Sequence, residues 1–147
     1  MLVQQKIRAT AQAVIQRGSA FLVYESFDKI KKEYFYRPVG GGVDFLEPAA
    51  KTVLREVYEE LGIEVVNPVF LGFSENIFTF EGLPGHELVQ IFQCEIKDKA
   101  NYERESFVVI ESGRNEGSAV WKSRDDLLKP EVRFYPNGMK DIISKIM

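Results

Sequence analysis

Apolar and polar positions alternate along the first part of the chain, and a period of two is typical of β-strands. Later segments carry the same alternation or are rich in β-branched and aromatic residues. Strands are therefore expected at Ile7–Ile15, Ala20–Glu25, Glu33–Pro38, Val65–Gly72, Ile77–Glu81, Glu87–Ile96 and Ala119–Lys122.

The period changes after the glycines at positions 40–42. Apolar residues then recur at the spacing of one helix face, namely at Ala50, Val53, Leu54, Val57 and Leu61. Proline is favoured at the first helical position and glycine directly after a helix, so Pro48 and Gly62 mark the two ends. The pattern predicts a helix over Pro48–Leu61, and similar spacing predicts a second helix over Pro136–Ile146.

Many predicted strands and few helices indicate an α+β fold, in which helices cover the two faces of a mixed sheet. The length of 147 residues is that of one ordinary domain, so we expect one domain over residues 1–147. Hydrophobic residues make up 45% and charged residues 28%, a balance that allows a substantial core. Disorder as the dominant state is excluded.

Charge and composition also limit the binding partners and the cellular compartment that we expect for this protein. The net charge of −3 supplies no general positive field, so a nucleic acid polymer is a disfavoured partner, whereas a homodimer stays open. The N-terminal residues lack the apolar core of a signal peptide, and no apolar run has the ~20 residues of a membrane span. The lone Cys94 cannot form an internal disulfide and is expected as a small buried hydrophobe. These features favour a cytoplasmic protein.

Three glutamates of the first predicted helix, Glu56, Glu59 and Glu60, share one flank. Lys51 and Arg55 fall on the opposite flank, where a straight helix predicts that they cannot neutralise the acidic patch. Hard divalent cations, Mg²⁺ above all, favour carboxylate oxygens and usually arrive with substrate phosphates. The patch is therefore either a solvated acidic face or a metal site, and the spacing alone does not decide.

A wider pattern surrounds these glutamates. It consists of Gly41, five residues, Glu47, seven residues and then the run Arg55-Glu56-Val57-Tyr58-Glu59-Glu60-Leu61-Gly62-Ile63. This pattern resembles the complete Nudix box, for which a chance match is on the order of one in ten million. The approach Tyr36-Arg37-Pro38-Val39-Gly40 and the later segments around Trp121 and Asp125 are also similar to Nudix hydrolase domains.

The resemblance implies a three-layer α/β/α sandwich with a mixed β-sheet. It also implies hydrolysis of a nucleoside diphosphate linked to another group, with Mg²⁺ (or Mn²⁺) as cofactor. By position, Glu56 and Glu60 would be metal ligands, and Glu59 a further ligand or a water-orienting group. The Gly41 carbonyl would be an extra ligand. Glu47 and Arg55 would support the box, with Arg55 orienting its carboxylates.

The position of the general base varies in this family between the box and a later loop. Glu116 is the loop candidate, because glycines flank it and would let the segment move. Glu111 is a competitor, and Glu59 or Glu56 would take the role if the base lies in the box.

Two arginines are candidate phosphate-binding residues. Arg37 lies just before the glycine turn and Arg8 lies on the first strand, and a guanidinium at either place suits a phosphate as well as a surface ion pair. The single His86 has no partner for a triad or a zinc site and is expected as a plain turn residue. Phe78 and Phe80 are candidates for stacking on a base.

The resemblance leaves the substrate partly open. Signatures of the ADP-ribose and dinucleoside-polyphosphate subgroups are missing, so a nucleoside triphosphate or a related nucleotide is favoured. ADP-ribose or a nucleotide sugar is the alternative substrate, and a non-catalytic nucleotide-binding module is the alternative class. Two loop positions depart from the common pattern, Leu46 where many members have glycine and Asp44 where glutamate is common.

Overall fold

The computed structural model describes residues 5–147. In this part of the chain the strands are β1 (Arg8–Arg17), β2 (Ala20–Asp28), β3 (Glu33–Arg37), β4 (Val39–Gly42), β5 (Val65–Phe80), β6 (Leu83–Ile96), β7 (Ser106–Glu111) and β8 (Arg114–Ser123). The helices are α1 (Ala49–Leu61), α2 (Arg124–Leu127) and α3 (Met139–Ser144), with a 3₁₀ turn at Lys99–Glu103.

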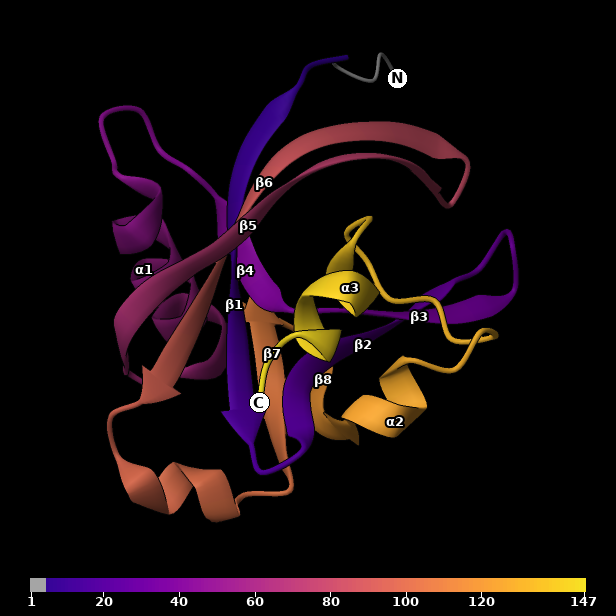
Figure 1. Ribbon diagram of the computed structural model, residues 1–147. Coiled ribbons are helices and arrows are strands. Elements are labelled where there is room, and N and C mark those ends of the chain that lie inside the picture. Colours follow the sequence, from indigo (N-terminus) through magenta and orange to yellow (C-terminus); the bar gives the residue numbers. More distant parts are fainter. Residues whose placement is uncertain (1–4) are drawn as a thin grey trace.

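The strands form one mixed sheet in the order β5-β6-β1-β2-β8-β7, with β3 beside β2 and β4 beside β1 (Figure 1). β1 and β6 run parallel, whereas the other pairs are antiparallel. β1 pairs with β2 only near their shared turn, at Gln16 with Phe21 and Arg17 with Ala20. Beyond that point β1 takes β4 as its neighbour and β2 takes β3, so the two halves of the sheet diverge.

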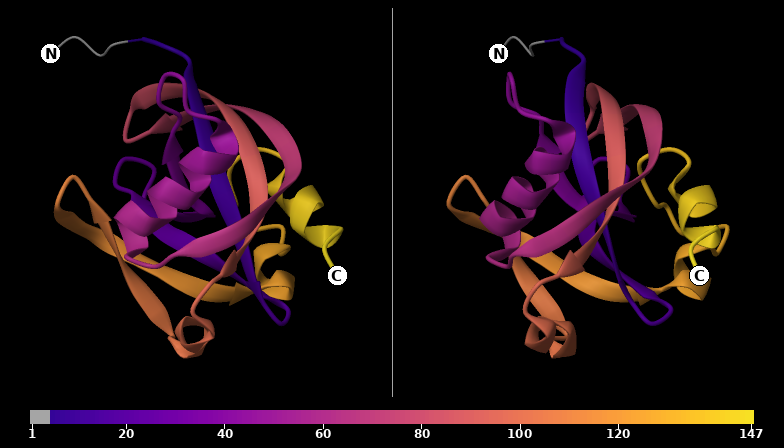
Figure 2. Two further views of the ribbon diagram at one scale, coloured as in Figure 1. Left: turned by 90° about the vertical axis from the view of Figure 1, so that its left-hand side faces the viewer. Right: turned by 60° about the vertical axis from the view of Figure 1, so that its left-hand side comes forward.

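Helices cover both faces of the sheet. Figure 2 shows α1 on one face and α2 with α3 on the other. The side chains of β1 follow this division, since Ala11, Ala13 and Ile15 belong to the core under α1 while Val14 belongs to the core under α2 and α3. The predicted α+β sandwich with three layers and a mixed sheet is confirmed.

The helix that was expected over Pro48–Leu61 is confirmed as α1. It begins one residue later, because Pro48 is extended (φ −64°, ψ 141°) and caps the helix. Gly62 ends it in the left-handed conformation at φ 70°, and its N–H donates to the Tyr58 carbonyl. The C-terminal helix is shorter than predicted and covers only Met139–Ser144. No helix within residues 5–147 is long and apolar enough to cross a membrane.

The hairpin of β5 and β6 is longer than predicted. The segment between Gly72 and Ile77 was expected to interrupt the strand, but β5 is continuous because its buried polar residues have partners on the C-terminal segment. The Ser74 hydroxyl donates to the Asn137 carbonyl at 2.6 Å, and Asn76 accepts from the Asn137 N–H at 3.2 Å. The polar residues Ser74 and Asn76 therefore indicate a contact with the C-terminal segment and not the end of a strand.

His86 is a strand residue and not the turn residue that its neighbours predicted. The run Pro84-Gly85 belongs to β6, and a Cβ on Gly85 would lie 2.3 Å from Cζ of Phe78, so glycine serves here for close packing. The His86 Nε2 lies 2.9 Å from a carboxylate oxygen of Glu75 on the paired strand. Cys94 is buried as predicted, and burial raises the pKa of its thiol to about 12.

Leu46, in the loop before α1, has a left-handed backbone conformation at φ 69° with a side chain that is 87% exposed. Leu46→Gly is expected to raise the free energy of unfolding by about 0.5–1 kcal/mol, because a residue with a Cβ is strained in this conformation and little packing is lost. Urea unfolding measures the change. The neighbouring Phe45→Gly is the matched control, since Phe45 is 91% exposed and has a negative φ. Equal destabilisation by both variants would contradict the assignment of strain.

Candidate active site

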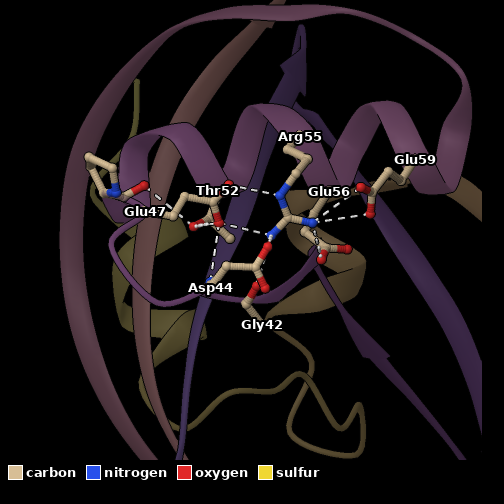
Figure 3. Close-up of polar contacts among 8 residues, drawn as sticks. Gly42, Asp44, Glu47, Thr52, Arg55, Glu56 and Glu59 are labelled. Carbon is tan, nitrogen blue, oxygen red and sulfur yellow. Dashed lines mark hydrogen bonds and ion pairs between the residues drawn. The ribbon is translucent and has the colours of Figure 1, made fainter.

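Arg55 on α1 joins the helix to the loop that precedes it (Figure 3). Its Nε and Nη2 donate to the Glu47 carboxylate at 2.8 and 2.9 Å, and Nη2 also donates to the Gly42 carbonyl at 3.0 Å. Its Nη1 donates to Glu56 at 2.9 Å and to Glu59 at 3.1 Å. One guanidinium therefore fixes the loop and two box glutamates together.

The prediction that Arg55 cannot neutralise the acidic flank is wrong. A helical wheel considers only the direction in which each side chain leaves the helix. The arginine side chain is long enough to extend along the helix surface, and it reaches Glu56 and, one turn further on, Glu59. Lys51 is exposed and takes no part in these contacts. The hydrogen bonds from Arg55 and Thr52 lower the pKa of Glu47 to about 2, so the loop carboxylate stays ionised.

Arg55→Lys is expected to lower the free energy of unfolding by about 1–3 kcal/mol, because an ammonium cannot reproduce the planar, multiple contacts of the guanidinium. The urea midpoint measures the loss. Lys51→Ala on the same helix is the control and should change stability by no more than about 0.5 kcal/mol. An Arg55→Lys variant as stable as the parent protein would show that the network does not hold the loop to the helix.

Glu60 is the buried glutamate of the box, with 8% of its surface exposed. Burial raises the pKa of its carboxyl to about 8. The positive charge of Arg37 acts in the opposite direction and lowers this pKa, whereas contact with the Glu56 carboxyl adds to the rise. Glu56 in turn lies against the backbone of Gly41, where a Cβ would be 2.4 Å from Cδ of Glu56. Only glycine at position 41 leaves room for this carboxylate.

A cavity of about 730 Å³ opens beside the box glutamates, a volume typical of small-molecule sites. The site residues expected from the sequence that line it are Arg8, Arg37, Gly41, Glu56, Glu59, Glu60, Phe78, Phe80 and Glu116, and Glu111 lines it as well. Arg55 and Glu47 are outside its lining and belong to the network between loop and helix. The fold thus brings residues from β1, β3, β4, α1, β5 and the β7–β8 hairpin to one cavity.

The two candidate phosphate-binding arginines differ in their surroundings. The Arg37 guanidinium lies over the ring of Tyr24, with Cζ 4.8 Å from the ring centroid, and its charge acts on the Glu60 carboxyl. Arg8 is half exposed and already has an anionic partner, the Glu87 carboxylate at 3.3 Å. Arg37 is therefore the more direct electrostatic counterpart of the box.

Glu116 lies on β8, so the prediction of a mobile loop at this residue is wrong. The hairpin turns at Ser112 and Gly113, and the Tyr24 hydroxyl donates to the backbone carbonyl of Glu116, which ties the strand to β2. The Glu116 residue is exposed and lines the cavity. Glu111, across the hairpin, also lines the cavity, and its charge adds to the raised pKa of Glu60.

Metal binding can be judged from the donor groups. Among residues 5–147, no three carboxylate, imidazole or thiolate side chains converge closely enough to hold an ion. A pair of carboxylates is nevertheless suited to binding an ion. The carboxyls of Glu56 and Glu60 are in contact and Glu60 is buried, an arrangement that favours either a proton shared between them or a bound cation. Their oxygens are of the kind that Mg²⁺ prefers. Glu59 instead pairs with Arg55 and would have to turn to join them.

Sequence reasoning missed several polar strand residues that line the same cavity, namely Thr10, Gln12, Tyr24, Asp28 and Asn76. All of them are buried. Thr10 and Gln12 stand in the same alternating row of β1 as the apolar Val14, and a polar residue in such a row is uncommon in a core. That local departure is the signal that could have revealed them.

A family model described as the NUDIX domain matches residues 6–141. The chain belongs to the Nudix family. It is a Nudix hydrolase, an enzyme of a family that cleaves pyrophosphate bonds and generally uses divalent metal ions. A search of curated proteins found no match.

Solved structures support the fold. The MutT NUDIX hydrolase of Burkholderia pseudomallei is 23% identical with a TM-score of 0.67, and the match covers 97% of this chain and 100% of that one. A NUDIX hydrolase of Nitrosomonas europaea is 19% identical with a TM-score of 0.65, covering 95% and 87% of the two chains. The MutT protein of Methanosarcina mazei is 20% identical with a TM-score of 0.63, covering 97% and 94%. This Nudix chain thus has the family architecture over nearly its whole length.

Proposed function

We propose that this Nudix hydrolase cleaves a phosphoanhydride bond of a nucleoside triphosphate or a related small nucleotide, and that it requires Mg²⁺ or Mn²⁺. The observation that carries the proposal is the meeting of the Glu56–Glu60 pair and Arg37 at one cavity of about 730 Å³. Carboxylates that hold a cation, in the same cavity as the Arg37 guanidinium, suit the dense negative charge of a polyphosphate.

Each residue has a defined role in this proposal. Glu56, Glu59, Glu60 and the Gly41 carbonyl would hold the cation, which when bound neutralises phosphoryl oxygens and favours attack by water. Arg37 binds phosphate oxygens at the cavity wall, and Arg8 does so at its rim by sharing its charge with Glu87. Arg55 positions Glu56 through the contact described above, and Glu59 would leave its contact with Arg55 to join the cation. Glu116 accepts the proton of the attacking water.

The proposal takes residues 1–147 as one catalytic domain that acts in the cytoplasm on a small molecule. The net charge of −3 gives no support for a nucleic acid polymer as substrate. A homodimer is compatible with every residue role, because each of the proposed groups comes from one chain.

Product analysis tests the substrate class. The purified protein is incubated with Mg²⁺ and separately with nucleoside triphosphates, ADP-ribose, nucleotide sugars and dinucleoside polyphosphates. Release of a nucleoside monophosphate with pyrophosphate is the expected result, and incubation with EDTA should abolish it. AMP with a sugar phosphate would make ADP-ribose the substrate, and tight binding without turnover of any compound would indicate a non-catalytic module.

A further inference from the structure

Two buried polar atoms at the cavity have no hydrogen-bond partner. Thr10 is 3% exposed and Gln12 is 5% exposed, and both line the cavity. Within residues 5–147, Oγ1 of Thr10 and Oε1 of Gln12 accept and donate no hydrogen bond. Buried polar groups are nearly always paired, so an unpaired amide oxygen beside a cavity points to a partner that the protein chain does not supply.

The strand register separates these two residues from the box glutamates. Thr10 pairs with Gly42 and Gln12 with Gly40, whereas Ala11 pairs with Gly41, against which Glu56 packs. Side chains alternate along a strand, so Thr10 and Gln12 face away from Glu56. Gly40 and Gly42 put no side chain beside them, and the cavity therefore extends from the box past the glycine strand to Thr10 and Gln12.

Aromatic rings form the neighbouring wall of this part of the cavity. The Phe35 ring lies 5.7 Å from that of Phe80 and 5.8 Å from that of Tyr135, and all three residues line the cavity. Hydrogen bonds between the tips of the β2–β3 and β5–β6 hairpins hold the wall in place. The Glu81 N–H donates to Asp28 at 3.0 Å, and Lys31 Nζ donates to the Thr79 carbonyl at 2.8 Å.

We propose that Gln12 and Thr10 read the edge of the substrate's nucleobase, and that the enzyme prefers bases that present an exocyclic amino group. The inference rests on the proposed nucleotide substrate. A flat heteroaromatic ring suits the aromatic wall, with its edge at the two unpaired oxygens. In the orientation that the structure shows, the Gln12 oxygen accepts a hydrogen bond from an amino group, whereas a keto oxygen at the same ring position would require the amide to rotate so that its Nε2 donates instead. The Thr10 hydroxyl can donate or accept a hydrogen bond, so it can pair with the neighbouring ring position of a base with an amino group or of one with a keto group.

Matched substrates and variants test this assignment. ATP is compared with ITP and CTP with UTP, since each pair exchanges an amino group for a keto group at one ring position. We expect kcat/KM to favour the amino member of at least one pair by about tenfold or more, and Gln12→Leu to bring the ratio close to one. Thr10→Val, which removes the hydroxyl but keeps the shape, should reduce activity towards both members equally.

Stability separates recognition from a structural role. Because Gln12→Leu removes an unpaired buried oxygen, its urea midpoint should stay unchanged or rise. A purely structural Gln12 would lower kcat/KM for both members of a pair and leave their ratio unchanged, which would overturn the inference. Turnover of nucleotides without amino preference in the parent protein would also overturn it while leaving the proposed function standing. No turnover of any nucleotide would instead remove the proposed function itself.

Discussion

Glu60→Gln should remove most of the hydrolytic activity, by about 10²-fold or more in kcat/KM, while the protein stays folded. The amide keeps the shape of the carboxyl but loses the negative charge that a divalent cation needs. The structure makes this position informative, since Glu60 is the buried member of the box glutamates and contacts the Glu56 carboxyl. Activity with a substrate identified by product analysis, titrated with Mg²⁺, is the measurement.

The same variant should be more stable than the parent protein when metal is removed with EDTA. Burial raises the pKa of Glu60 from 4.5 to about 8, so between these pH values the native state binds a proton that the unfolded chain has lost. The free energy of unfolding of the parent protein therefore falls as pH rises from about 5 to about 8. The amide of Glu60→Gln does not titrate, so the variant does not suffer this loss of stability. We expect a gain of about 2 kcal/mol at pH 8 and little difference at pH 5.

Glu64→Gln provides the matched control for both measurements. Glu64 lies three residues beyond the helix, is well exposed and faces Lys97 at 3.5 Å rather than the cavity. The control should keep its activity and its pH profile of stability. A Glu60→Gln variant that unfolds in EDTA at pH 8 at a lower urea concentration than the parent protein would contradict the conclusion that ionisation of the buried Glu60 carboxyl costs stability.

The sequence predicts the parts of the fold that depend on local patterns. The apolar stripe from Ala50 to Leu61 and the glycine at position 62 define α1 to within one residue, because amphipathic spacing and a left-handed cap are properties of a short segment. The long β5 could not be predicted in the same way. Its polar residues Ser74 and Asn76 are compatible with a buried strand only because Asn137, far away in the chain, bonds to both.

In the candidate site, too, some features follow from the local sequence and others depend on contacts between distant segments. The spacing of Glu56, Glu59 and Glu60 on one turn of a helix is visible in the sequence, whereas the pairing of Arg55 with loop and helix depends on the path of the loop. The unpaired oxygen of Gln12 is a still less local property, since it requires knowing every neighbour of a buried side chain. Motifs therefore locate the glutamates, and packing is needed to locate the polar groups that line the rest of the cavity.

Glu116→Gln should lower kcat by about 10²- to 10⁴-fold with little change in metal affinity, if Glu116 is the general base. Its carboxylate is suited to this role because it lines the cavity and, within residues 5–147, makes no ion pair, so its lone pairs are free for a water proton. The hydrogen bond from Tyr24 to its backbone ties the strand to β2, so in this role the carboxylate would reach substrate by side-chain rotation and not by loop movement.

Glu111→Gln is the decisive comparison, because Glu111 lies on the other strand of the same hairpin, lines the same cavity and influences the pKa of Glu60. Single-turnover rates across pH, together with Mn²⁺ binding, are measured for both variants. If Glu116 is the base, only its replacement removes the acidic limb of the rate profile, and Mn²⁺ binds both variants normally. The reverse pattern would transfer the role to Glu111. Weaker Mn²⁺ binding by Glu116→Gln would make Glu116 a metal ligand, and a normal rate in both variants would return the base to Glu56 or Glu59.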